Sequence, residues 1–302
     1  MDKPITYIID IKKISNSHET IIQSCYNLIG YYHKNPDAKI IIDFRNIDFM
    51  YPDYSILLLC AIKHLDKLGI KVSGRIRYNT KSSIVPYLAR INFFKYLNIQ
   101  IPGEFKRLEN NRFVEIQEYN ENNQIKVLKS ILTVIKENSL INDNVFASLD
   151  YCLNEILDNV LNHSEVKVGW VVAQYFEKMN AIRIMVADNG IGIHKSLNKR
   201  HNFSEIDSIE NCINSGVTNG LGQGHGLYAT STFTKMNKGW LSLISGNKKL
   251  DVSEKYTKTN TVSFWQGTCV YLRVNTNVDV DYKKFTSNHF DYKEQLFEDM
   301  FK

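Results

Sequence analysis

The chain lacks an apolar run long enough to cross a membrane. Its longest apolar stretch, YSILLLCAI at residues 54–62, covers about half a membrane span, and charged residues follow it at once. A signal-peptide layout is also missing, because the short apolar stretch near the start leads into charge rather than into a small-residue cleavage site. We therefore expect a cytoplasmic protein that does not act in a membrane.

Paired cysteines and a strong charge bias are absent as well. Without a CxxC pair, we expect free thiols in a reducing compartment rather than disulfides or a zinc site. The formal net charge is only +5 and no arginine-rich stripe stands out, which argues against a nucleic-acid partner. The five cysteines are scattered along the chain: Cys25, Cys60, Cys152, Cys212 and Cys269.

The composition is that of an ordinary globular protein, with 43% hydrophobic and 23% charged residues. The length of 302 residues suggests two domains. In the first third, short β-branched runs alternate with helical spacing, which indicates a layered α/β domain at residues 1–110. The pattern predicts strands at 5–10, 38–44 and 70–76 and helices at 18–35, 52–69 and 82–97.

A second domain is expected at residues 111–280, with a charged and aromatic tail at 281–302. A long irregular stretch at 194–224 interrupts it and holds one short helical piece. We predict strands at 113–119, 166–177, 181–188, 239–245, 261–265 and 268–274, and helices at 122–138, 143–163 and 225–236. The tail could form a docking helix, and equally a solvated tail or a helix packed on the second domain. The anchors of a docking helix would be Phe285, Phe290, Leu296 and Phe301.

The helix at 143–163 has an unusual polar face. Glu155, Asn159, Asn162 and His163 share one side of it, opposite an apolar stripe. A carboxylate can orient or deprotonate a nucleophile, and an amide oxygen suits Mg²⁺. Taken alone, the pattern also fits a polar helix face with capping near His163.

Two glycine-containing segments follow. In VADNGIGI, residues 186–193, a strand ends on Asp188, and Gly190 and Gly192 allow a flat ligand to approach the backbone. In GLGQGHGL, residues 220–227, alternating glycines precede a helix whose N-terminus favours phosphate. Taken alone, the first segment also fits a tight turn and the second a flexible linker. The second is neither a Walker A sequence nor a dinucleotide fingerprint.

These segments in this order resemble the GHKL superfamily of ATPases. NEILDNVLNH resembles its N box, DNGIGI and GLGQGHGL its two glycine boxes, and QGTCVYL the strand that closes the nucleotide pocket. The resemblance covers roughly residues 142–274. It implies an α+β fold, a Bergerat α/β sandwich with a mixed sheet and helices on one face. It also implies ATP and Mg²⁺ as ligands.

The resemblance implies a role for each matching residue. Glu155 would be the general base, Asn159 would bind Mg²⁺, and Asp188 would contact the adenine amino group, directly and through water near Thr268. Residues 194–221 would form a mobile lid over the nucleotide. The implied nucleotide-binding set is Asn159, His163, Asp188, Gly190, Gly192, Ile193, Gly222, Gly224, His225, Gly226, Leu227 and Thr268.

The first third resembles a STAS domain, the fold of anti-sigma-factor antagonists, over about forty residues. In MYPDYSIL, residues 50–57, Pro52 and Asp53 stand where the family has an Asp-Ser pair, and Ser55 lies inside the expected helix. A phosphate switch at the usual position is therefore not predicted. A generic α/β layer is the alternative, in which Asp53 caps its helix.

Together these features predict an ATP- and Mg²⁺-binding regulatory switch. It would hydrolyse ATP, or phosphorylate serine or threonine in a protein partner, as anti-sigma kinases do in partner-switching systems. The alternative is a nucleotide-gated protein-binding module with little catalysis. A phosphoacceptor role for His18 in SHET is disfavoured, and a homodimer stays possible.

Overall fold

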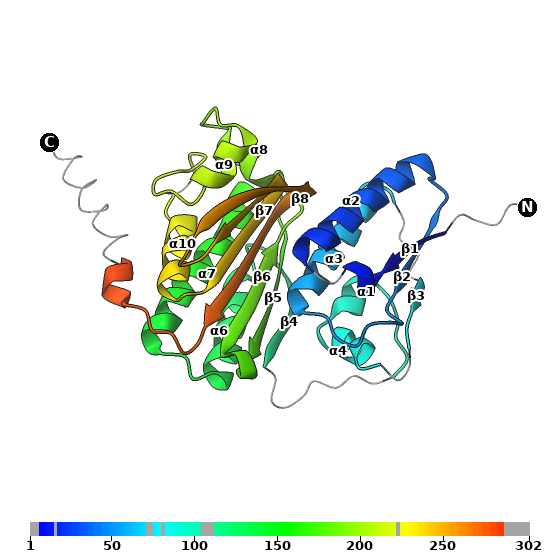
Figure 1. Cartoon of the computed structure of the whole chain (residues 1–302), viewed down its shortest axis with the longest axis horizontal. Helices are drawn as coiled ribbons and strands as arrows, with labels where there is room; N and C mark the ends of the chain where they lie inside the picture. Colours follow the sequence, from blue (N-terminus) through cyan, green and yellow to red (C-terminus); the bar gives the residue numbers. More distant parts are fainter. Residues whose placement is uncertain are drawn as a thin grey trace, which may run out of the picture.

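The computed structural model describes residues 6–14, 17–70, 75–79, 82–103, 112–221 and 224–286. They form two units that lie side by side (Figure 1). The N-terminal unit, residues 6–103, holds a three-stranded sheet in the order β1-β2-β3. The large-sheet unit, residues 112–286, holds a five-stranded sheet in the order β4-β5-β6-β8-β7.

The N-terminal unit is an α/β layer, as its alternating pattern predicts. Its strands, β1 (Thr6–Asp10), β2 (Lys39–Asp43) and β3 (Arg75–Arg77), are parallel. The expected helix at 82–97 is two helices, because Asn92 takes a left-handed φ of 65° between them. The helices are α1 (Ile11–Ile14), α2 (His18–Lys34), α3 (Pro52–Lys67), α4 (Ile84–Arg90) and α5 (Phe93–Tyr96).

Helix α3 is the central element of the N-terminal unit. Pro52 begins it, in the first turn where a missing N–H costs no hydrogen bond. Eleven of its 16 residues are buried, far more than one face of a surface helix would supply. The reason is that α3 also packs against β5 and β6 of the large sheet. The apolar run at 54–62 is therefore a helix enclosed by protein.

The large sheet is antiparallel throughout the described strands: β4 (Phe113–Tyr119), β5 (Gly169–Phe176), β6 (Ala181–Ala187), β7 (Trp240–Val252) and β8 (Thr257–Asn275). The expectation of a mixed sheet is wrong. Strand β7 runs parallel to β6, but β8 lies between them and pairs with both. The two expected strands at 261–265 and 268–274 are parts of the single long strand β8.

Both faces of the large sheet are covered. Helices α6 (Gln124–Asn138), α7 (Asp143–His163) and α10 (Gly226–Met236) cover one face, on the side away from the N-terminal unit (Figure 1). Alternate strand residues such as Ile182, Ile184 and Val186 face these helices. Helices α2 and α3 cover the other face, where Trp170, Met185 and other residues join their apolar core.

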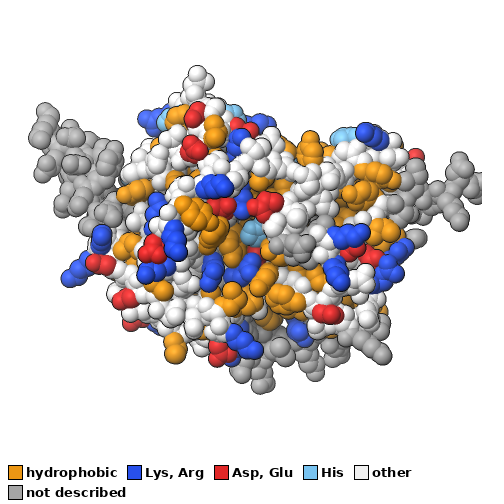
Figure 2. Space-filling model, in the orientation of Figure 1, with side chains coloured by type: hydrophobic (Ala, Val, Ile, Leu, Met, Phe, Trp, Pro, Cys, Tyr) orange, Lys and Arg blue, Asp and Glu red, His pale blue; other side chains and the backbone are white. Residues whose placement is uncertain are grey.

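The described part of the C-terminal tail, residues 281–286, packs on the large-sheet unit. Phe285 is 1% exposed, and its ring packs against Tyr151 of α7 and Phe233 of α10. At this residue the tail therefore packs on its own chain, whereas the predicted anchors Phe290, Leu296 and Phe301 lie outside the described residues. Among the described helices, none is both long and apolar enough for a membrane span. Figure 2 shows side chains of both charge signs interspersed over one face.

Candidate functional site

A cavity of about 720 Å³ opens between α7, the end of β6, the segment after it and the start of α10. Gly190 is not part of the cavity wall, and Gly222 lies outside the described residues. The predicted site residues that line the cavity are Glu155, Asn159, His163, Asp188, Gly192, Ile193, Gly224, His225, Gly226, Leu227 and Thr268. The fold thus gathers residues more than 100 positions apart in the chain, while their individual roles stay predictions.

Asp188 lies just past the end of β6, at the base of the cavity. It is 1% exposed, and burial raises the pKa of its carboxyl group to about 7. Its Oδ1 accepts a hydrogen bond from the backbone N–H of Gly190 at 2.7 Å, and its own N–H donates to the carbonyl of Thr268 at 2.9 Å. The described part of the chain places no side-chain donor on this carboxyl group.

The glycines around Asp188 are required by close packing. A Cβ atom on Gly267, which has a φ of +95°, would lie 2.3 Å from the carbonyl oxygen of Asp188. A Cβ atom on Gly190 would lie 2.1 Å from the carbonyl oxygen of Ser164, at the end of α7. Gly190 therefore lets the turn pack against α7, whereas its predicted contact with a nucleotide has no support from the cavity wall.

Helix α7 supplies the opposite wall. Burial, followed by the nearby charge of Asp158, raises the pKa of Glu155. A hydrogen bond from Tyr151 to this carboxylate acts in the other direction. Tyr151 also lines the cavity, and sequence reasoning missed it. Its position, four residues before Glu155 on the same helix face, is the signal that could have identified it.

Asn159 and His163 lie further along the same face of α7. Within the described residues, no hydrogen bond to the side chain of Asn159 is present, so its amide oxygen is available to a ligand in the cavity. An oxygen donor of this kind fits Mg²⁺, which takes its other ligands from water and phosphate. His163 is half-buried, and burial lowers its pKa while a hydrogen bond with Asn219 opposes that shift.

The segment expected as an irregular lid contains two helices, α8 (Gly192–Leu197) and α9 (Glu205–Asn211). Ser204 and Asp207 form a capping box that begins α9, in the short helical piece that the sequence predicts. Asn219, which is 9% exposed, donates to Ser196 of α8 at 3.0 Å. The contact of Asn219 with Ser196 joins the two ends of this segment, and its hydrogen bond with His163 joins the segment to α7 beside the cavity.

The glycine-rich segment ends at the N-terminus of α10. Gly224 has a φ of +72°, and its carbonyl oxygen accepts a hydrogen bond from Gly216 at 3.1 Å. This turn directs the first residues of α10, Gly226 and Leu227, to the cavity wall. The free N–H groups and positive end of a helix favour an anion there. The cavity wall thus includes the buried carboxyl group of Asp188 and, separately, the N-terminus of α10, whose backbone N–H groups can bind an anion.

Comparison with known proteins agrees with this arrangement. Residues 145–277 match the family described as histidine kinase-, DNA gyrase B-, and HSP90-like ATPase. The match includes all the predicted site residues, and β4 and α6 of the same sheet unit lie before it. No curated protein is similar enough to the chain to count as a match. Residues 145–277 of this chain therefore form an ATPase domain of the histidine kinase, gyrase and HSP90 family.

Proposed function

We propose that the protein binds ATP with Mg²⁺ in this cavity and acts as a regulatory switch. The observation that carries the proposal is the meeting of Glu155, Asn159, Asp188 and the start of α10 around one cavity. Asp188 would accept a hydrogen bond from the adenine amino group. The N-terminus of α10 and an Asn159-bound Mg²⁺ would hold the phosphates and balance their charge.

Glu155 is the proposed general base. Its raised pKa makes the carboxylate a stronger base than an exposed glutamate, and the Tyr151 hydroxyl fixes its orientation. It would accept a proton from water in ATP hydrolysis, or from an acceptor hydroxyl in phosphotransfer. Both reactions use the same carboxylate, so Glu155 is compatible with an ATPase and with a serine or threonine kinase.

The phosphoacceptor of a kinase reaction would belong to a separate protein. Ser55 is 0% exposed, and its hydroxyl donates to the carbonyl of Pro52 at 2.6 Å inside the first turn of α3. His18 is also buried, and its ring is hydrogen-bonded to Asp53. Neither side chain can reach a nucleotide while the N-terminal unit is docked. We propose that this STAS-like unit regulates the ATPase domain rather than serving as its substrate.

A nucleotide-gated binding module is the second candidate. The observation that favours it is the network through Asn219, which joins the two ends of the segment at 194–221 to each other and joins the segment to α7 beside the cavity. ATP would order this segment and create a surface for a protein partner.

Incubation of the purified chain with γ-labelled ATP and Mg²⁺, with and without candidate proteins, tests these alternatives. Release of labelled phosphate would identify an ATPase, and transfer of label to protein would identify a kinase. Binding without either product would identify a gated module. Absence of nucleotide binding would refute the proposed function.

A further inference from the structure

Helix α3 lies along β6, the strand that ends at the proposed adenine-contacting residue. Side chains of β6 alternate between the two faces of the large sheet. Met185 and Ala187 point toward the N-terminal unit, and both join the core that contains α3. Arg183 is on the same face, so this strand presents one buried cation to α3.

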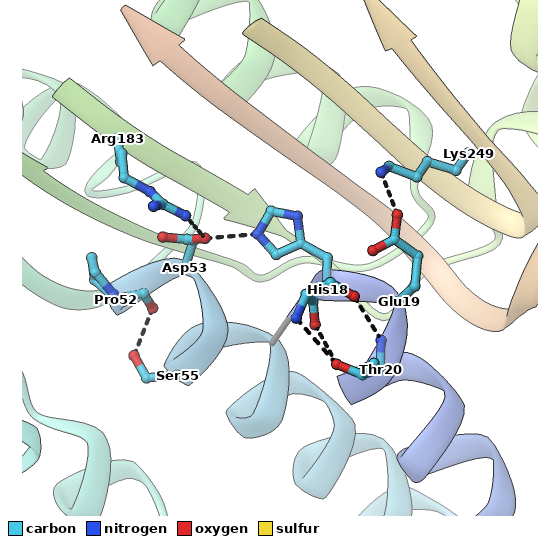
Figure 3. Close-up of polar contacts among 9 residues, drawn as sticks. His18, Glu19, Thr20, Pro52, Asp53, Ser55, Arg183 and Lys249 are labelled. Carbon is cyan, nitrogen blue, oxygen red and sulfur yellow. Dashed lines mark hydrogen bonds and ion pairs between the residues drawn. The ribbon is translucent and has the colours of Figure 1, made fainter. Parts of the chain in front are cut away.

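A buried ion cluster ties the N-terminal end of α3 to β6 (Figure 3). The Oδ2 atom of Asp53, on α3, accepts hydrogen bonds from Arg183 and from His18 of α2, each at 2.7 Å. The side chain of Asp53 is 1% exposed. The guanidinium of Arg183 also lies 3.6 Å from the ring centre of Tyr51 and 5.2 Å from that of Tyr271.

Such a cluster fixes one docked arrangement. A charge left without its partner in this buried place is strongly unfavourable, so Asp53 and Arg183 must meet for the two units to pack in this way. The apolar contacts around these two residues would tolerate small displacements of the N-terminal unit relative to the large sheet. The ion cluster would not, because a displacement separates its charges. The second ion pair across the same interface, between Glu19 of α2 and Lys249 of β7, does not involve α3 (Figure 3).

A second polar contact ties the middle of α3 to the nucleotide cavity. The side-chain N–H of Asn189 donates to the carbonyl of Cys60 at 3.0 Å, and Asn189 is 6% exposed. Asn189 lies between Asp188 and Gly190 in the chain. The backbone N–H of Gly190 donates a hydrogen bond to the carboxyl group of Asp188. Asn189 is thus a positioning residue: a shift of the Asp188–Gly190 turn would move its amide relative to α3.

We propose that nucleotide binding and docking of the N-terminal unit are coupled through α3, by the Asp53–Arg183 contact in the first half of β6 and the Asn189–Cys60 contact just past its last residue. This inference rests on the proposed nucleotide binding at Asp188. The cavity is present while α3 is docked, and we take this docked arrangement as the nucleotide-binding state. By linkage, the nucleotide then strengthens docking by the same factor. Loss of the nucleotide would loosen the unit and expose the α2 and α3 surface to a partner.

The test combines two measurements on the full-length chain. The first is hydrogen exchange of α3 amides in the wild-type chain, with and without a non-hydrolysable ATP analogue and Mg²⁺. The second is the affinity for that analogue in wild type, Asp53→Asn and Asp43→Asn. Asp43→Asn is a matched control, because Asp43 is a buried aspartate of the same unit whose partner, Arg45 at 2.6 Å, lies away from the interface.

Coupling predicts that the analogue slows exchange in α3, that Asp53→Asn weakens its binding about fivefold or more, and that Asp43→Asn changes it by less than about twofold. Unchanged α3 exchange in a wild-type chain that binds the analogue would overturn the coupling. So would equal affinities in wild type and in a folded Asp53→Asn variant. If Asp53→Asn does not fold, the wild-type exchange alone decides. A wild-type chain that binds no analogue would instead refute the proposed function.

Discussion

The Oε2 atom of Glu155 lies 2.5 Å from the position that a Cβ atom would occupy on Gly226. The proposed base on α7 and the N-terminus of α10 are therefore in direct contact at the cavity wall. A glycine at this place leaves the carboxylate beside the helix end where phosphate would bind. The contact connects the first and third of the segments that the sequence singles out.

Gly226→Ala tests this contact. The added methyl group would displace the Glu155 carboxylate, so we expect ATP turnover to fall by about tenfold or more while the chain stays folded. The matched control is Gly30→Ala in α2, where a Cβ atom would meet nothing within 4 Å. This control should leave turnover unchanged and stabilise the fold by about 0.5–1 kcal/mol. Equal turnover in both variants would show that Glu155 has room to adjust.

Glu155→Gln tests the proposed base itself. The amide keeps the shape of the side chain but cannot accept a proton, so turnover should fall by about 10²-fold or more while nucleotide affinity changes little. Asp150→Asn, on the same helix but away from the cavity wall, is the control. Steady-state phosphate release and equilibrium binding would be measured side by side. Undiminished phosphate release by Glu155→Gln would remove the catalytic role of this residue.

The raised pKa of Asp188 predicts how the stability of the nucleotide-free chain depends on pH. Its pKa is raised from 3.8 to about 7 in the folded chain, so the folded state holds a proton that the unfolded state releases. The stabilisation is fully present below pH 3.8 and is lost as the pH rises through about 7. Between about pH 5 and pH 8, the free energy of unfolding should fall by roughly 2–4 kcal/mol more in wild type than in Asp188→Asn. Denaturant titrations that give parallel pH curves for both chains would contradict this burial effect.

Much of the site was predictable because its signals are local. Glu155, Asn159 and His163 share a helix face by spacing alone, and Asp188 ends an apolar strand. Asn219 was missed because its importance depends on a contact with His163 of another element, which no single segment displays. Tyr151 was missed although it lies four residues before Glu155 on the same helix. Helix α8 was missed because it is short and starts at Gly192, a residue that propensity places in turns.

The fold was predictable at the level of elements but not of their arrangement. Every expected strand has a counterpart, yet the position of β8 between β6 and β7 depends on how residues 188–239 pack, and that decides the antiparallel sheet. Helix α3 is buried on several sides because the N-terminal unit docks on the large sheet, and this arrangement is likewise not visible in the sequence. Its apolar run already contained the signal, since a helix with so little polar surface must be enclosed.

The most direct test of the central claim is calorimetric titration of the purified chain with a non-hydrolysable ATP analogue and Mg²⁺, in wild type and Asp188→Asn. Circular dichroism would establish that both chains are folded. We predict that wild type binds the nucleotide at one site per chain and that Asp188→Asn loses most of this affinity. Absence of binding to wild type, or equal binding to both chains, would contradict the assignment of this cavity to ATP.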